Sequence, residues 1–473
     1  MGLDRRSFLR GGAAFAAWTA SALATPLEAL AAADGRRSPG YGPLAPVRDG
    51  VTGLPLLQLP PHFRYFSFGW AGDPMIDGRP TPPGHDGAAA FAAPGGRIHY
   101  VRNHELHLHP RIPLRASFAP PERTWDAGEA PGGVTTATFD PRRPTATRTE
   151  ARLSGTLRNC AGGPTPWGTW LSCEETLDGP DDSSEDARLE RTHGWVFEVA
   201  PTGPVRPEPI PGLGRMWHEA VAVDPATRIL YLTEDRPRSG LYRFVPDGPA
   251  ALGGLARGGR LEMLAIEGEP LLETGKRLPA GRWVDVRWVP IRDPERPHED
   301  PKLRDGRGLL SQGLEGGGAT FRRGEGAWFG DGRVFFVATS GGAAGAGQIF
   351  ELDPGGSRGA GRDRLRLVFE SAGPHELDRP DNLVVSPRGT LLLCEDAEEH
   401  RPFMRGLTRE GAVFDLARNH VVLDGERNGL RGDFRHMEFA GACFSPDGRW
   451  LLASIQWPGI SFAITGPWER GPL

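Results

Sequence analysis

The sequence predicts an all-β protein, a six-bladed β-propeller with long loops between some of its blades. The chain has 66 Gly and 46 Pro among its 473 residues, and so many turn-forming residues favour short strands over helices. A pattern of three apolar strands separated by turn residues recurs six times without a helical period. Repeats of this kind are typical of β-propellers. A pair of β-sandwiches would not explain the recurrence.

The six copies begin near residues 85, 161, 219, 326, 381 and 441. The third copy is the clearest, with apolar strands over residues 219–224, 229–235 and 241–245. The second strand of a copy often ends in a pair of acidic residues. The spacing between copies is uneven because of insertions, the longest of which covers residues 246–325. That insertion is rich in Gly and Arg, so we expect it to be a loop.

Charge and hydropathy argue against two classes of partner. The chain has 55 Lys and Arg against 60 Asp and Glu, which gives a formal charge of −5 and a pI near 6.3. This balance provides no general attraction to nucleic acid or to an anionic membrane. No continuous apolar stretch after the N-terminal region is long enough to span a bilayer, so we expect no stable membrane insertion.

The N-terminal region resembles a twin-arginine export signal. The paired Arg5 and Arg6 are followed by a weakly apolar, Ala-rich run over residues 11–24 and by small residues at 29–33 that fit a cleavage site. A buried N-terminal helix is the alternative, and it would combine a charged start with a face made only of alanine.

We therefore expect three parts. A twin-arginine signal peptide covers residues 1–33, an N-terminal extension that packs on the propeller covers residues 34–84, and a single catalytic β-propeller domain covers residues 85–473. The twin-arginine translocase is the expected partner during export. We expect the mature protein to be a monomer located in the periplasm or secreted.

Four cysteines follow the signal: Cys160, Cys173, Cys394 and Cys443. In an exported protein the usual expectation is two disulfide bonds, and Cys160 with Cys173 is one conceivable pair. A cysteine of this set could equally be a metal ligand or a buried thiol. The Gly-Gly-Pro turn after Cys160 favours a thiol exposed toward the centre of the propeller.

Acidic residues recur at matching places in the repeats. The innermost strands of a propeller meet at a central channel, so residues at matching ends of the blades come together. The starts of the inner strands carry Asp86, Cys160, Glu219, Glu325 and Asp381. The ends of the second strands carry Asn103, Glu105, Glu174, Glu175, Glu234, Asp235, Glu395 and Asp396. Carboxylates gathered at one channel mouth repel one another unless cations neutralise them, and a thiolate among them suggests hard cations together with a transition metal.

Two copies lack this acidic ending. Their second strands end in Thr339-Ser340-Gly341 and in Ser454-Ile455-Gln456. We therefore expect these two blades not to contribute to the metal cluster.

Residues 159–175, which read NCAGGPTPWGTWLSCEE, closely resemble the sequence motif of PhoX-type alkaline phosphatases. Further matching motifs follow in the family's order across about residues 85–455: Asn103-His104-Glu105, His218-Glu219-Ala220, Thr233-Glu234-Asp235, Arg323-Gly324-Glu325-Gly326 and Asp381-Asn382-Leu383. A block of this length with two Trp and two Cys is highly specific.

This resemblance implies a six-bladed propeller whose channel holds two ferric ions bridged by an oxo group, together with three calcium ions. It implies that iron binding or metal bridging involves Cys160, Glu175, Glu219 and Glu325. Calcium would bind Glu219, Glu325 and Asp381, with Asn103, Glu105, Glu174, Asp235 and Glu395 as further candidates. Arg323 matches the phosphate-contacting arginine of the family, and a guanidinium suits a tetrahedral anion because it donates two charge-assisted hydrogen bonds.

The function implied is a metal-dependent phosphomonoesterase that hydrolyses small phosphate monoesters by attack of a metal-bound oxygen in the central channel. Two further functions stay open from the residues alone. A calcium-dependent, lactonase-like hydrolase on a six-bladed propeller would need calcium but no iron and would tolerate loss of Cys160. A non-catalytic binding propeller would show neither turnover nor a metal cluster.

Overall fold

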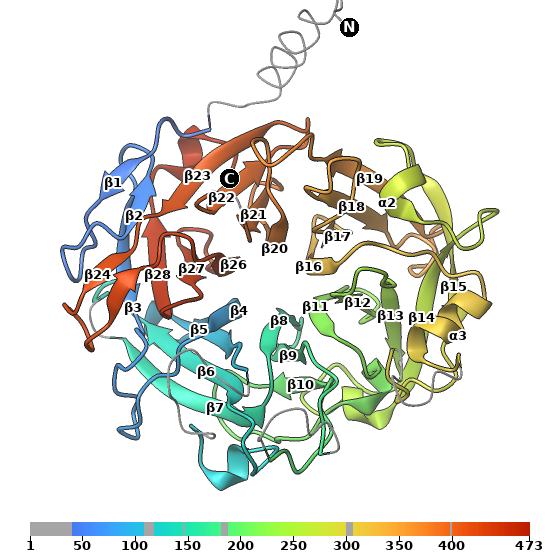
Figure 1. The fold of residues 1–473 in the computed structure, drawn as a ribbon, viewed down its shortest axis with the longest axis horizontal. Coiled ribbons are helices and arrows are strands. Elements are labelled where there is room, and N and C mark those ends of the chain that lie inside the picture. Colours follow the sequence, from blue (N-terminus) through green and yellow to red (C-terminus); the bar gives the residue numbers. More distant parts are fainter. Residues whose placement is uncertain (1–39, 108–117, 145–146, 181–187, 299–305, 398–399) are drawn as a thin grey trace, which may run out of the picture.

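Figure 1 shows β-sheets arranged around a common centre, in the manner of a propeller. The computed structural model describes residues 40–107, 118–144, 147–180, 188–298, 306–397 and 400–473. Strands make up most of the regular structure in these ranges, and the helices are short. The expectation of an all-β, propeller-like fold is thereby confirmed, whereas the expected signal over residues 1–33 lies outside the described residues.

The sheets follow one another along the chain. The first two contain β4 (His85–Ala93), β5 (Arg97–His104), β6 (Gly132–Phe139) and β7 (Arg148–Thr156), and then β8 (Asn159–Pro164), β9 (Trp170–Glu174) and β10 (Val196–Val199). A nine-stranded sheet follows, made of β11 (His218–Val223), β12 (Leu230–Glu234), β13 (Tyr242–Pro246), β14 (Gly259–Ile266), β15 (Val284–Pro290), β16 (Gly324–Gly330), β17 (Arg333–Ala338), β18 (Gln348–Asp353) and β19 (Arg364–Glu370).

The last sheets combine both ends of the described chain. One contains β20 (Pro380–Val385), β21 (Leu391–Glu395), β22 (Phe403–Leu407) and β23 (Val413–Asn419), extended by β2 (Leu57–Leu59) and β1 (Ala45–Val47). Another contains β26 (Phe439–Phe444), β27 (Leu451–Ile455), β28 (Ile460–Thr465) and β3 (Arg64–Phe68), and β24 (Val422–Asp424) pairs with β25 (Arg431–Asp433). The short helices are α2 (Thr274–Arg277), α3 (Leu309–Glu315) and the 3₁₀ turns Pro94–Gly96, Pro121–Arg123, Pro211–Leu213, Leu255–Arg257 and Trp468–Arg470.

The innermost strands form a closed ring (Figure 1). In order around the centre, β4, β8, β11, β16, β20 and β26 each contact the next, and β26 contacts β4. Glycines allow this close approach. A Cβ atom on Gly163 of β8 would lie 1.6 Å from the carbonyl oxygen of Val221 in β11, and one on Gly326 of β16 would lie 2.6 Å from the carbonyl oxygen of Asp381 in β20. Only a residue without a side chain fits where two backbones are this close.

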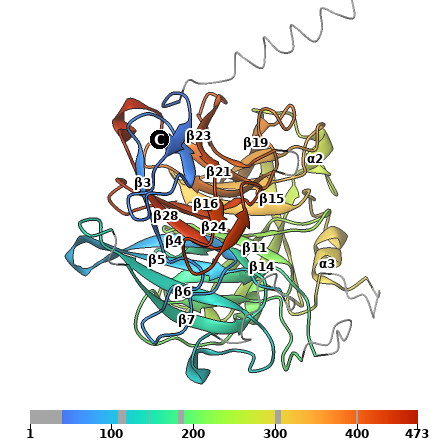
Figure 2. The same ribbon diagram turned by 60° about the vertical axis from the view of Figure 1, so that its left-hand side comes forward.

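The segment before residue 85 supplies strands to the sheets. Figure 2 shows β3 beside β28, and the two strands pair antiparallel from Ser461–Phe68 to Thr465–Arg64. Strand β2 pairs with β23 in the neighbouring sheet. Buried Tyr65 lies in the apolar core that joins these two sheets. The phenolic oxygen of Tyr65 accepts hydrogen bonds from the backbone of Leu56 and Leu57.

The insertion over residues 246–325 differs from the expected loop. It forms β14, β15, α2 and α3, while residues 299–305 lie outside the described ranges. Strand β14 continues the sheet beyond β13, and β15 pairs with both β14 and β19, which joins two sheets into one. Leu261, Met263 and Ala265 of β14 are buried and alternate along the strand. This strand pattern was not recognised in the sequence because the insertion as a whole is rich in Gly and Arg.

None of the helices in the described ranges has the length and apolar character needed to cross a bilayer.

The contact at Gly163 predicts a large effect of adding one methyl group. We expect Gly163→Ala to lower the free energy of unfolding by about 3 kcal/mol or more, because the new Cβ would overlap the backbone of β11. Gly275→Ala in α2 is the matched control. The nearest atoms to its new Cβ belong to the flexible side chain of Arg322, and alanine is favoured in a helix. Urea unfolding measures both changes, and equal stability of the two variants would contradict the close approach of β8 and β11.

Candidate functional site

Each strand of the inner ring has a β-bulge near its start. The pairing register shifts after His85 in β4, Asn159 in β8, His218 in β11, Gly324 in β16, Pro380 in β20 and Ala440 in β26. A bulge bends the strand and changes the direction of the side chains within it. The residues that directly follow these positions are Asp86, Cys160, Glu219, Glu325, Asp381 and Gly441. Five of the six strands thus place a chemically active side chain in the bulge.

A second repeated feature brings the end of the next strand beside the bulge. The backbone N–H of one residue at that end donates to the carbonyl of the residue immediately before the inner strand, with N–O distances of 2.8–3.2 Å. The donor and acceptor pairs are Glu105 and Gly84, Glu175 and Arg158, Asp235 and Trp217, Thr339 and Arg323, Asp396 and Arg379, and Gln456 and Glu438. The same six donor residues therefore lie at one level around the ring.

These two sets of positions enclose a central cavity of about 210 Å³. Nine of the residues that line it carry carboxylates: Asp86, Glu105, Glu175, Glu219, Asp235, Glu325, Asp381, Asp396 and Glu438. The lining is completed by the thiol of Cys160, the guanidinium groups of Arg158 and Arg323, Thr339 and Gln456. The cavity therefore has a large excess of acidic groups over cationic ones.

Two groups of these side chains are close enough to hold metal ions. One ligand atom each from Cys160, Glu175 and Glu219 lie within 4.8 Å of one another, and the same is true of Glu219, Glu325 and Asp381. Glu219 belongs to both groups, so two metal positions would share its carboxylate. In this structure the Cys160 thiol donates to the carbonyl of His218, with Sγ and the oxygen 3.2 Å apart.

Burial and mutual repulsion disfavour the ionised forms of these acids. Burial, with the neighbouring Asp381, raises the pKa of Glu219 well above its usual range, and burial with the neighbouring Asp235 does the same for the pKa of Glu325. The pKa of Asp381 is raised to about 7, mainly by burial. Burial and Glu219 also raise the pKa of the Cys160 thiol. Bound cations reverse such shifts, so this donor set is typical of a metal centre.

Arg323 lies at the edge of the cavity in a left-handed backbone conformation with φ of 53°. Its Nε and Nη2 donate to the two carboxylate oxygens of Asp235 at 2.8 and 2.7 Å, and Nη2 lies 3.0 Å from Glu325. The guanidinium is thus oriented by two carboxylates of the cavity and remains about one-third exposed.

The family described as alkaline phosphatase PhoX matches residues 39–459, which is most of the sequence. The chain belongs to this family. It is accordingly a metal-dependent phosphomonoesterase, as its motifs predicted. No curated protein matches the sequence.

A solved structure shows the same fold at low sequence identity. Pseudomonas fluorescens PhoX, in complex with vanadate as a transition-state analogue, has a TM-score of 0.65 and 17% identity, and the match covers 89% of this chain and 98% of that chain. A weaker likeness is to a catalytically inactive virginiamycin B lyase from Staphylococcus aureus, solved with quinupristin. That match has a TM-score of 0.39 and 11% identity over 85% of this chain and 99% of that one.

Seven of the ligand residues expected from the PhoX motifs line the cavity, and three do not. The seven are Cys160, Glu175, Glu219, Glu325, Asp381, Glu105 and Asp235, and Arg323 lines it as well. The three that the structure places elsewhere are Asn103, Glu174 and Glu395. They are buried among protein groups with which they form hydrogen bonds.

Asn103 is hydrogen-bonded to the bulge of β8 that contains Cys160. Its amide donates to the carbonyls of Cys160 and Ala161, and its side-chain oxygen accepts from Trp170 and Ser172. Every polar atom of this side chain is therefore occupied. Asn103 therefore positions the bulge that contains Cys160 and is not among the groups that line the cavity.

In each acidic pair, the first carboxylate turns away from the cavity because neighbouring side chains of a strand point in opposite directions. Glu174 Oε1 lies 2.6 Å from His193 Nδ1, Glu234 Oε1 lies 2.5 Å from His298 Nδ1, and Glu395 Oε1 lies 2.7 Å from Arg405 Nε. The second member of each pair, Glu175, Asp235 or Asp396, faces the cavity.

Several lining residues were absent from the ligand set that the PhoX motifs implied: Asp86, Arg158, Thr339, Asp396, Glu438 and Gln456. The two copies without acidic endings also reach the cavity, because Thr339 and Gln456 occupy the same positions as the acids of the other copies. The Gln456 amide donates to Asp86 at 3.0 Å and to Glu105 at 2.7 Å. Asp396 could have been predicted from the sequence. Side chains alternate along a strand, so the second member of the Glu395-Asp396 pair faces the cavity when the first does not.

The four cysteines, all within the described ranges, are free and buried, so the disulfides considered from the sequence are not formed.

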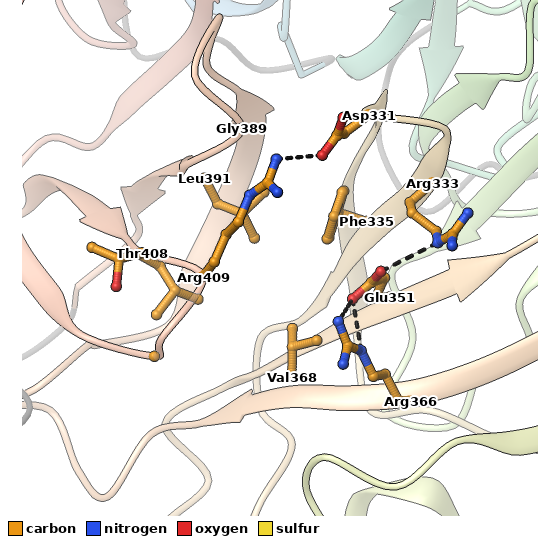
Figure 3. Close-up of a pocket in the computed structure, with 12 residues that line it drawn as sticks. Asp331, Arg333, Phe335, Glu351, Arg366, Val368, Gly389, Leu391, Thr408 and Arg409 are labelled. Atoms are coloured by element: carbon orange, nitrogen blue, oxygen red, sulfur yellow. Dashed lines mark hydrogen bonds and ion pairs between the residues drawn. The ribbon is translucent and has the colours of Figure 1, made fainter. Parts of the chain in front are cut away.

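A second cavity of about 240 Å³ lies at the outside of the ring, between the sheet of β17–β19 and that of β21 and β22 (Figure 3). Its three arginines already have carboxylate partners. Arg409 pairs with Asp331, while Arg333 and Arg366 both pair with Glu351. Because these charges are mutually satisfied, the cavity lacks the excess charge of the central site.

The buried His193 predicts a pH-dependent contribution to stability. Although burial favours its neutral form, Glu174 and Asp126 raise the pKa of His193 to about 9, above the ordinary value of 6.5. A folded pKa above the unfolded one stabilises the fold below about pH 6.5, and this contribution is lost as the pH rises through about 9.

We expect the difference in unfolding free energy between the unsubstituted protein and His193→Gln to shrink by about 3 kcal/mol between about pH 6 and pH 9.5. Urea unfolding at the two pH values measures it. Comparing the two proteins cancels the titration of the cavity carboxylates, and a difference that does not change with pH would contradict a charged His193.

Proposed function

We propose that the central cavity is the phosphomonoesterase site and that its carboxylates and Cys160 hold a multinuclear metal centre. The observation that carries this proposal is the pair of ligand groups that share Glu219. Cys160 and Glu175 complete the first group, and Glu325 and Asp381 complete the second. Glu105 and Asp235, which line the same cavity, are the further candidate ligands.

The chemistry of the donors supports two kinds of metal ion. A thiolate with carboxylates suits a transition metal such as Fe³⁺, whereas carboxylates alone suit Ca²⁺. We therefore propose that iron binds at Cys160, Glu175 and Glu219, and that calcium binds at Glu219, Glu325 and Asp381. Two ferric and three calcium ions per chain is the content implied by the family resemblance.

The charges are consistent with this content. When ionised, the nine carboxylates, the thiol and the two guanidinium groups that line the cavity carry a net charge of −8. Two ferric ions, three calcium ions and one oxide carry a net charge of about +10. The loaded cavity would then attract a phosphate monoester, which carries about two negative charges at alkaline pH.

Such cations, when bound, supply the Lewis acidity that neutralises phosphoryl oxygens and activates water. The protein supplies position and orientation. Arg323 would bind the phosphoryl group through its planar guanidinium, which Asp235 and Glu325 hold at the edge of the cavity.

We also infer that the propeller has six blades. The six inner strands, their six bulges and the six equivalent backbone hydrogen bonds at the strand ends support this number. The nine-stranded sheet would then consist of two blades joined through β15 and β19.

The cellular setting is part of the proposal. Residues 1–33 would direct export of the folded protein by the twin-arginine translocase, and the enzyme would act as a monomer in the periplasm or secreted. The three-part division into residues 1–33, 34–84 and 85–473 remains the proposed organisation. A lactonase-like activity is less favoured, because a calcium site made of oxygen ligands gives no role to the Cys160 thiol in the ligand group.

Loss of the thiol tests the proposed iron site. We expect Cys160→Ala to lose bound iron and to lower turnover of 4-nitrophenyl phosphate by about 100-fold or more. Cys443→Ala is the matched control, since Cys443 is also a free, buried cysteine but does not line the cavity. Elemental analysis and a phosphatase assay with and without chelator measure both variants. Calcium without iron in the unsubstituted protein, or full activity of Cys160→Ala, would contradict the proposal.

The shared carboxylate allows a second test. We expect Glu219→Gln to reduce both iron and calcium content, because Glu219 belongs to both ligand groups. Asp381→Asn should reduce calcium but leave iron bound, because Asp381 belongs only to the second group. Elemental analysis of the purified variants distinguishes the two patterns. Loss of the same metals in both variants would rule out this division of the ligands.

A further inference from the structure

Arg158 has the same structural setting as Arg323. Each arginine precedes the first residue of an inner strand, β8 or β16, and each has a left-handed backbone conformation, with φ of 50° and 53°. The carbonyl of each accepts a 2.9 Å hydrogen bond from the residue at the end of the next strand, Glu175 or Thr339. Each lies two residues before a proposed metal ligand, Cys160 or Glu325.

The two guanidinium groups also have matching environments. Arg158 Nη2 donates to Glu175 at 2.7 Å, and its Nε lies 3.7 Å from a carboxylate oxygen of Glu105. The side chains of Arg158 and Arg323 are 31% and 32% exposed, so both remain open to the cavity that they line. Within the described part of the chain, Nη1 of neither arginine donates a hydrogen bond. Each therefore keeps a donor for an incoming anion.

Arg158 and Arg323 lie on different sides of the strand that carries Glu219. Strands β8 and β16 lie on either side of β11, which carries Glu219. The two arginines, which both line the cavity, therefore come from the strands on either side of the one that carries Glu219. Glu175, the partner of Arg158, is also a member of the ligand group with Cys160 and Glu219. An anion bound at the metal centre would consequently meet a guanidinium on both flanks.

We propose that Arg158 is a second substrate-binding residue, which contacts the phosphoryl group of the phosphate monoester together with Arg323. Two planar guanidinium groups would then bind different oxygens of one tetrahedral group and fix its orientation. This proposal rests on the function proposed for the cavity. The simpler role for Arg158 is that of a counter-ion that only holds Glu175 and Glu105 in place.

The two roles differ in what a lysine can replace. A lysine at position 158 keeps the positive charge beside Glu175 but lacks the planar fork of donors. Arg158→Lys should therefore retain the metals whichever role is correct. Arg158→Met removes the charge as well. Because any of these residues adopts the left-handed conformation at a similar cost, the variants differ mainly in their side-chain chemistry.

Inorganic phosphate is the probe, and its dissociation constant for the metal-loaded protein is measured by calorimetry beside the iron and calcium content. We expect Arg158→Lys to keep its metals and to bind phosphate about ten- to one hundredfold more weakly, and we expect the same of Arg323→Lys. Arg379→Lys is the matched control. Arg379 has the same left-handed conformation before β20, with φ of 46°, but is not among the residues lining the cavity. Its substitution should leave phosphate binding unchanged.

Three results would overturn the inference. Unchanged phosphate affinity in both Arg158 variants at full metal content would assign Arg158 the counter-ion role. Normal affinity in Arg158→Lys with loss of metals in Arg158→Met would do the same. Loss of metals from both variants would make Arg158 a structural residue. In all three cases the unsubstituted protein would still bind phosphate and hydrolyse monoesters, whereas failure of the proposed function itself would abolish both in that protein.

Discussion

The concentration of negative charge in one small cavity is the constraint on which the rest of this structure depends. Nine carboxylates and a thiol line a space of about 210 Å³, and carboxylates held this close cannot all be ionised without cations. The surrounding fold supports the arrangement because each acid comes from a strand, or from the end of one, whose backbone is already paired in its own sheet. Apolar packing between the sheets therefore stabilises the molecule, whereas the acidic groups at the centre repel one another.

Two local features decide which side chains reach that centre. In five of the six inner strands the bulge directs one side chain toward the cavity. At the end of the following strand, the alternation of side chains selects the second member of each acidic pair. The first members stay in the scaffold, where His193, His298 and Arg405 hold them. The two carboxylates of each pair thus have different roles. The first forms an ion pair that fixes the end of the strand, and the second lines the cavity.

Much of this could be predicted from the sequence, and the failures have physical causes. The strand pattern was sufficient for the all-β, propeller-like fold. The motif around Cys160 was sufficient for the family, and the further family motifs added most of the lining acids. Asn103, Glu174 and Glu395 do not line the cavity, which the motifs could not indicate because a motif gives the order of residues but not the side of the strand that each one faces. Glu438 and Arg158 were missed since they precede their strands, where no apolar pattern marks them. The insertion was taken for a loop because its glycines and arginines outnumber the alternating apolar residues of β14.

The pairing of β3 with β28 has a consequence for the order in which the molecule assembles. Residues 64–68 find their partners only at residues 461–465, so the last sheet cannot form until almost the whole chain has been synthesised. Until then β3 presents an unpaired edge, and the inner ring, which includes β26 of the same sheet, stays open. The central cavity is lined by residues from β4 to β26 and from the segments beside them, so it is complete only when the ring has closed. The site therefore forms late in folding, when β3 near the start of the described chain pairs with β28 near its end.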